Sequence, residues 1–223
     1  MGAETEILPI FPLSDVVLFP RVTTPLHLFE PRYRQMAEHA LAGPRRIGMV
    51  TVPPEHVAAM RDDPPIHPVG CAGIVTRARK RSDGRYDILL HGTHRFRIQN
   101  ERVRSEGRLY RVAEVALLED AYDPADADRV GELRTRLVEI LSELIRASHP
   151  DRLPPISEPW LRDLDDVTFV NSLANAVALP PLEKQGLLEV DSICERCERL
   201  EGLLSFQRAG LRAPGGPPSG ALH

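Results

Sequence analysis

The segment PIFPLSDVVLFPRVTTPLHLFEPRYRQM, residues 9–36, limits the possible folds more than any other part of the chain. Its prolines at 12, 20, 25 and 31 stand too close together for a long helix, because proline lacks an N–H group and disfavours a helical residue before it. The apolar runs between them, residues 16–19 and 25–29, are predicted as short buried strands. Pro31 can begin a helix whose apolar side holds Tyr33, Met36, Ala37, Ala40 and Leu41.

Most of the first half of the chain has the pattern of strands. Further strands are expected over residues 7–13, 46–52, 69–77, 85–91, 94–98 and 109–118. The tip Ser82-Asp83-Gly84 indicates a hairpin. Residues 53–68 form a proline-rich connection with a helical turn expected at 55–60. Many short strands joined by turns favour a closed or nearly closed barrel.

The second half changes to a helical period. Three helices are expected to be capped by Asp123, Asp166 and Asp191, and a further short one begins at Pro181. Prolines at 150, 154, 155 and 159 interrupt the chain, and the composition of residues 209–223 is that of a disordered tail. We therefore expect an α+β protein with a barrel subdomain over residues 7–118 and a small helical bundle over residues 119–208.

Three blocks of this sequence resemble the amino-terminal substrate-binding domain of the Lon protease family. They are VVLFP with PLHLFE in residues 16–30, VGCAGIV in residues 69–75, and DGRYDILLHGTHRFRI in residues 83–98. The resemblance implies a PUA-like β-barrel with one small helix, followed by a helical bundle. It also implies recognition of unfolded or degron-bearing polypeptide, either as an adaptor that works with a separate protease or as a binder unrelated to proteolysis.

The enzymatic parts of that family have no counterpart in this sequence. A phosphate-binding loop needs Gly-Lys-Ser/Thr after a glycine-rich turn, and no such triplet occurs. A Ser-Lys protease needs a lysine whose pKa is lowered in an apolar pocket. The two lysines, Lys80 in a charged hairpin and Lys184 on an expected polar helix face, do not fit that requirement. We therefore expect a stand-alone, non-catalytic module that uses no metal or cofactor.

Cysteine content and hydropathy point to a cytoplasmic protein. Three cysteines, Cys71, Cys194 and Cys197, are too few and odd in number for a disulfide framework. Cys194 and Cys197 form a single CxxC on an apolar helix face, so packing is favoured over a metal or redox role. No apolar run reaches the ~18 residues of a membrane helix, and no secretion signal is visible at the N-terminus.

Two groups of residues are candidates for peptide contact or for holding the barrel together. Phe29, Glu30, Arg32 and Tyr33 follow one another at a strand-to-helix junction, where an exposed Phe29 or Tyr33 could touch a peptide. A local capping or pairing role for Glu30 is the alternative. Arg95 follows a glycine turn, and a buried fork that hydrogen-bonds carbonyl or carboxylate groups is favoured over a ligand contact.

The competing interpretation is RNA binding, since PUA-like barrels also occur in RNA-modifying proteins. Residues 77–118 hold eleven basic and five acidic residues, hence +6, whereas residues 119–207 hold nine basic and nineteen acidic residues, hence −10. The cations nearest the hairpin tip could touch phosphates: Arg77, Arg79, Lys80, Arg81 and Arg85. Aromatic residues are almost absent there, so nucleic acid is disfavoured as a partner.

A third interpretation is an enzyme with a metal or small-molecule site. His91 and His94 flank a glycine-threonine pair and would be ligands only if a third group converged on them. A structural or solvent-facing role is favoured for both histidines.

Overall fold

The computed structural model describes residues 4–148 and 163–212, and the chain divides into two compact units. The barrel unit comprises residues 1–119 and 179–189, and the helical unit comprises residues 120–178 and 190–223. The ranges 7–118 and 119–208 stay a prediction for independently folding domains. Residues 179–189, expected in the bundle, group with the barrel unit.

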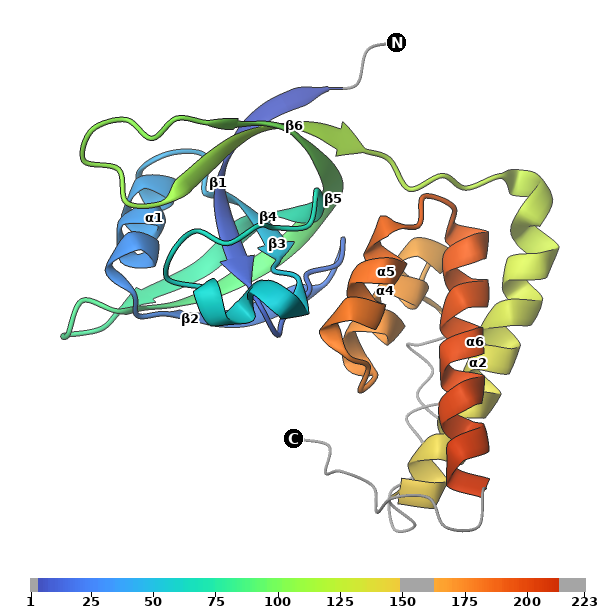
Figure 1. Ribbon diagram of the computed structural model, residues 1–223. Coiled ribbons are helices and arrows are strands. Elements are labelled where there is room, and N and C mark those ends of the chain that lie inside the picture. The colour runs from blue at the N-terminus through green and yellow to red at the C-terminus, as the bar shows by residue number, and fades with distance from the viewer. Residues whose placement is uncertain (1–3, 149–162, 213–223) are drawn as a thin grey trace. The chain divides into compact units, whose positions relative to one another are not determined.

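Six strands and one helix build most of the barrel unit. The strands are β1 Thr5–Leu13, β2 Thr23–Leu28, β3 Arg46–Thr51, β4 Val69–Lys80, β5 Tyr86–Arg102 and β6 Arg111–Leu118. Their order is β2-β5-β4-β3-β1-β6, and β6 pairs back onto β5, so five strands close into the ring seen in Figure 1. Only the β1–β3 pair is parallel among these strands. The expected α+β class and the closed barrel are confirmed.

The long strand β5 closes the barrel by changing partner near Gly92. Residues 86–91 of β5 pair with β2 and residues 95–102 pair with β6, while β4 lies along the opposite edge. At the change the Gly92 N–H donates to the carbonyl of Val22, and the Gly92 carbonyl accepts from Arg21, both at 2.8 Å. A break between residues 91 and 94 was therefore a wrong expectation, because Gly92 marks a close backbone approach inside one strand.

The run from residue 16 to 19 is buried but is not a strand. Val17, Leu18 and Phe19 are buried, yet the run pairs with no strand in the described part of the chain. The Phe19 carbonyl accepts from the Val22 N–H at 3.3 Å, and Arg21 has a φ of 64°. A short apolar run reports burial rather than backbone conformation, so the strand prediction was wrong here.

Helix α1, Pro31–Ala42, begins at the predicted proline and buries Tyr33, Met36, Ala37 and Ala40. The barrel interior is a cluster around Phe96, which includes Leu8, Ile10, Val50, Ala72, Ala113 and Val115. The connection after β3 holds a short 3-10 helix, η1 Pro54–Ala59, close to the predicted helical turn. Helix α5, Pro181–Glu189, joins the barrel unit, where the buried Gln185 donates to the carbonyl of Val69 at 3.0 Å.

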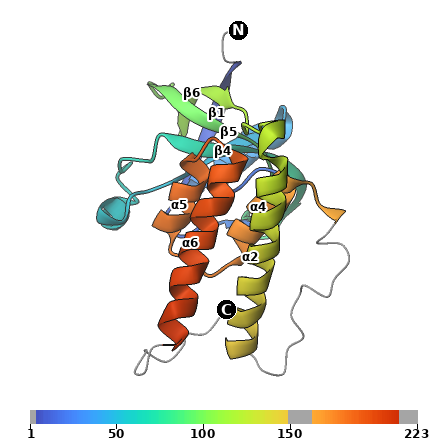
Figure 2. The same ribbon diagram turned by 90° about the vertical axis from the view of Figure 1, so that its right-hand side faces the viewer.

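The described residues of the helical unit form a 3-10 turn, η2 Pro124–Asp126, and three helices, α2 Ala127–Ser148, α4 Asp166–Ala176 and α6 Ile193–Arg212. Figures 1 and 2 both show α2 and α6 lying along each other. Asp123 caps η2 as predicted, since its carboxylate accepts from the Ala125 N–H. The other two caps lie one residue away from the predictions, at Asp165 for α4 and at Ser192 for α6.

Some expectations fall outside the described residues. The prolines between 150 and 159 and residues 213–223 are among these, whereas α6 continues to Arg212 through the first residues of the expected tail. Of the described helices, none combines the length and the apolar composition that crossing a lipid bilayer would need.

Candidate functional site

In the part of the chain that the structure describes, the histidines and cysteines do not converge on a reaction centre. His91 Nδ1 lies 2.9 Å from the Thr23 hydroxyl, and within residues 4–148 and 163–212 no cluster of three or more His, Cys, Asp or Glu side chains could hold a metal ion. All three cysteines are buried. Burial raises the pKa of Cys197 to about 12, so this thiol stays protonated at neutral pH. The burial of the cysteines supports packing as their role.

The two lysines differ in a way that the sequence analysis did not anticipate. Hydrogen bonding to Glu38 raises the pKa of Lys80, as expected for an exposed ion pair. Burial lowers the pKa of Lys184, although its helix face was expected to be polar. The expectation that neither lysine has a lowered pKa was therefore wrong for Lys184, because burial disfavours its charged form.

The basic hairpin is largely neutralised by carboxylates. Lys80 contacts Glu38 at 2.8 Å, Arg81 contacts Asp87 at 2.7 Å, and Arg85 contacts Asp83 at 3.3 Å. Such pairs leave less positive charge for a phosphate backbone than the sequence suggested. The RNA interpretation is therefore not favoured.

Arg77 and Arg79 are exposed and stand apart from these pairs. Neither forms an ion pair with another described residue. Both lie on β4, upstream of the hairpin tip.

Arg95 is fully buried and acts inside the barrel unit. Its guanidinium donates to the carbonyl of Glu119 at 2.8 Å and to that of Leu188 at 3.3 Å. These carbonyls belong to the segment after β6 and to the end of α5. The geometry supports the structural interpretation of Arg95, with its fork joining three parts of the barrel unit.

At the strand-to-helix junction, the structure separates Phe29 from Tyr33. Phe29 is 58% exposed directly after β2, and its ring stacks on His27 with centroids 6.1 Å apart. Tyr33 is only 4% exposed and packs edge-on against Phe11. An exposed Tyr33 was therefore a wrong expectation, because α1 turns that side of the helix towards the core. Burial also raises the pKa of Tyr33 to about 12.

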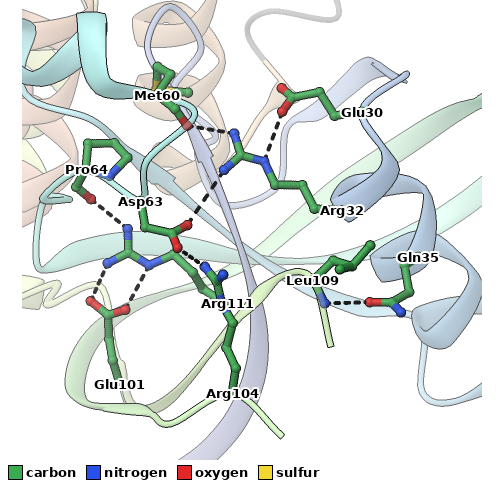
Figure 3. A network of polar contacts seen from close by, with 10 residues as sticks. All are labelled: Glu30, Arg32, Gln35, Met60, Asp63, Pro64, Glu101, Arg104, Leu109 and Arg111. Carbon is green, nitrogen blue, oxygen red and sulfur yellow. Dashed lines mark hydrogen bonds and ion pairs between the residues drawn. The ribbon is translucent and has the colours of Figure 1, made fainter. Parts of the chain in front are cut away.

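Arg32 and Glu30 take part in the polar network of Figure 3. Arg32 Nε donates to Glu30 at 2.9 Å, and Arg32 Nη2 donates to the Met60 carbonyl at 2.7 Å. Asp63 lies 3.7 Å from Arg32 and also pairs with Arg104. These contacts tie the β3–β4 connection to the start of α1, which agrees with the local pairing that was the alternative for Glu30.

The same network fixes the β5–β6 connection. Gln35 donates to the Gly107 carbonyl and accepts from the Leu109 N–H, both at 2.8 Å. Arg111 forms a two-point contact with Glu101. Of the four predicted residues at the junction, Phe29 is the one with a mainly exposed side chain.

Strand β2 has an open edge. It lies at the end of the strand order, and no described strand pairs with its side away from β5. The hydrogen bond from the Gly92 N–H to the Val22 carbonyl shows that Val22 turns its backbone groups towards β5, and this orientation alternates along an antiparallel pair. The even-numbered residues of β2 therefore bond to β5, and Thr23, Pro25 and His27 turn their backbone groups to the open edge. Pro25, which has no N–H, is compatible only with this orientation.

The strands β2, β5 and β4 also present an outer face to solvent. Two rows of residues cross it, namely Pro25, Leu89 and Arg77, then His27, Asp87 and Arg79. These six residues, with Leu26 and Ile88, line a shallow hollow of about 450 Å³. We call this feature the outer hollow. The opposite side of these strands faces α1, where Lys80 and Tyr86 both reach Glu38.

Sequence reasoning missed most of the outer hollow as a site. Pro25, His27 and Leu89 were placed in strands without a role, although Arg77 and Arg79 were named for a different reason. The available signal was Pro25, because a proline in the middle of a strand is tolerated mainly at a sheet edge. The pairing that brings His27 and Leu89 together could not be read from the chain.

Comparisons with known proteins give consistent results. The family model for the ATP-dependent protease La (LON) substrate-binding domain matches residues 7–205. A Lon protease of Xanthomonas oryzae is 27% identical over 205 residues, which is 90% of this chain and 23% of that protein. A Lon protease of Flavobacterium johnsoniae is 28% identical over 85% of this chain and 22% of its own length. This chain thus spans about a quarter of the curated relatives that it matches.

Two solved structures are similar to this one. The crystal structure of a Lon N-terminal domain protein from Xanthomonas campestris covers 90% of this chain and 98% of its own, with a TM-score of 0.58 and 27% identity. The N-terminal domain of the Mycobacterium avium complex Lon protease covers the same shares, with a TM-score of 0.67 and 17% identity. The second likeness concerns the fold alone.

Proposed function

Since this chain belongs to the family of LON substrate-binding domains, we propose that it binds extended polypeptide segments at the open edge of β2 and does not cut them. The observation that carries this proposal is the unpaired edge of β2, followed directly by the exposed ring of Phe29.

An unpaired strand edge is a physical basis for peptide recognition. An extended segment can add to it as a further strand, and its backbone bonds then provide affinity for many different sequences. At this edge Thr23 and His27 offer N–H and carbonyl groups, and Pro25 offers its carbonyl alone. Phe29 adds an apolar contact at the end of the strand. This combination suits unfolded chains, which expose both backbone and apolar groups.

The proposal includes the absence of cutting by this chain. No Gly-Lys-Ser/Thr triplet occurs in the sequence, and the matching family model describes a substrate-binding domain. In this proposal the module holds polypeptide in the cytoplasm, either by itself or for a separate protease. Any cutting of the polypeptide would be done by that separate protease.

We expect Phe29→Ala to weaken the binding of an unfolded model protein about tenfold, because an exposed aromatic ring at the edge of a binding surface supplies about 1.4 kcal/mol. Fluorescence anisotropy with a labelled, permanently unfolded polypeptide measures this change. Phe206→Ala is the matched control, since Phe206 is 82% exposed but lies on α6 of the helical unit. Equal affinity of the two variants would contradict the assignment of Phe29.

We expect His27→Pro to weaken binding more than His27→Ala does, by about fivefold. Both variants lose the imidazole and its 2.7 Å contact with Asp87. Only the proline also removes the outward N–H, which is worth about 1 kcal/mol as a hydrogen bond to a bound strand. The ladder to β5 keeps its donors in both cases, so a thermal melt should show similar stability. If the two variants bind alike, the open edge is not where the backbone of the peptide lies.

A further inference from the structure

Resting on the proposed function, we infer that the outer hollow selects polypeptide segments in which carboxylate side chains stand beside apolar ones. The partner is thus an extended, acidic-apolar stretch of an unfolded protein.

The charge of the outer hollow is the first part of the argument. Its one carboxylate, Asp87, is already engaged, because it accepts from Arg81 at 2.7 Å and lies 2.7 Å from His27 Nδ1. Hydrogen bonding to Arg81, followed by that to His27, lowers the pKa of Asp87. Arg77 and Arg79 have no such partner among the described residues. Among the described residues the hollow therefore keeps two arginines without an ion-pair partner, and a bound anion can pair with them.

The position of these arginines is the second part. Arg77 lies across the sheet from Leu89 and Pro25, and Arg79 lies across from Asp87 and His27. A strand added at the open edge of β2 would run antiparallel or parallel to β2, with alternate side chains over this face. Apolar side chains can then cover Pro25 and Leu89. The added strand would lie roughly 14 Å from β4, three strand spacings away, so an acidic side chain and an arginine must both extend across β2 and β5 to meet. The guanidinium groups then offer planar two-point donors.

The apolar content of the hollow is the third part. Pro25, Leu26, Ile88 and Leu89 contribute to its lining, so it is not a purely cationic surface. Phe29 extends the apolar area beyond β2 through its stack on His27. A polyanion without apolar groups would pair with the arginines but would leave the apolar lining of the hollow exposed to water. The mixture therefore distinguishes an acidic-apolar polypeptide from a nucleic acid.

The test compares two labelled peptides of about fifteen residues with the same apolar residues, one with glutamates between them and one with lysines. By anisotropy we expect the acidic peptide to bind about fivefold more tightly, since two exposed charge contacts supply a modest free energy. This preference should shrink at high salt. Arg77→Gln with Arg79→Gln should remove the preference while the lysine peptide still binds.

The matched control is Lys80→Gln with Arg85→Gln. It removes the same number of positive charges from the hairpin, but these residues have their own carboxylates and do not line the hollow. The control should keep the preference for the acidic peptide.

Four outcomes would overturn the inference, and the last of them would overturn the proposed function as well. Equal affinity for both peptides, with Phe29→Ala still weakening both, would remove the acidic selectivity and leave the proposed function standing. Equal loss in the two double variants would show a general charge effect. Stronger binding of a single-stranded RNA oligonucleotide than of the acidic peptide would identify a nucleic-acid surface. If neither peptide bound at high micromolar concentration, the proposed function would fail together with the inference.

Discussion

Gly92→Ala is expected to destabilise the barrel unit by about 3 kcal/mol. A Cβ atom at this position would lie 2.1 Å from the carbonyl oxygen of Phe19. That oxygen belongs to the backbone and cannot swing away like the end of a side chain. Relief requires β5 to move from the segment around Val22, which breaks the two 2.8 Å bonds that Gly92 makes there. The substitution therefore disturbs the point at which β5 stops pairing with β2 and begins to pair with β6.

Urea denaturation combined with hydrogen exchange of β2 and β5 would measure this effect, because exchange reports on the barrel unit even if the helical unit unfolds separately. Gly43→Ala is the matched control in the same unit. Its Cβ would meet its nearest neighbour, the His39 carbonyl, at an ordinary 3.5 Å, so a change within ~0.5 kcal/mol is expected. Similar stability of the two variants would mean that β5 does not pass Phe19 as closely as described.

Arg196→Met is expected to destabilise the helical unit by about 3 kcal/mol. Arg196 is fully buried on α6, and its guanidinium donates to Asp120 at 2.8 Å, to Asn171 at 2.8 Å and to the Val190 carbonyl at 2.7 Å. Methionine fills much of the same space but donates to none of these acceptors. Buried acceptors that lose their donors cost more than the bonds themselves contribute.

The measurement is urea denaturation followed by far-UV circular dichroism, which reports mainly on the helices. Arg199→Met is the control, since Arg199 is exposed about one turn further along the same helix. Adding Asp120→Asn to Arg196→Met should recover part of the loss, because the carboxylate charge is then gone. No recovery in the double variant would show that the Arg196–Asp120 pair is not the main source of the effect.

Local signals in the sequence were sufficient for the class of fold and for most element boundaries. Pro31 at the start of α1, Asp123 before η2 and the Ser82-Asp83-Gly84 tip all act within a few residues of themselves, so their effect is readable from the chain. The predictions that failed depended on distant partners. Residues 16–19 look like a strand by composition but pair with none among the described residues, and Gly92 looks like a break but permits a close approach to Phe19.

In the candidate site, too, some residues could be identified from the sequence and others depended on distant partners. Phe29 could be named from its position after a proline-containing strand, whereas the burial of Tyr33 and the lowered pKa of Lys184 depend on what packs against them. The ion pairs of Lys80, Arg81 and Arg85 join residues that the hairpin and α1 bring together. Arg77 and Arg79 carry the same charge as these three residues but lie in different surroundings. Counting charges in the sequence therefore could not show which cations have a carboxylate partner.

By itself the sequence determined a barrel of short strands, in which prolines rule out long helices, and a helical part after it. It also showed that the triplet that binds nucleotide phosphates is lacking. Each of these follows from residue types and their spacing. Only the tertiary structure decided that β2 keeps one edge unpaired and that two arginines lie beside Leu89 and Pro25. The physical reason is that strand pairing joins residues far apart in the chain, such as Thr23 and His91, which are 68 positions apart, and no local preference of the chain encodes which edges remain open.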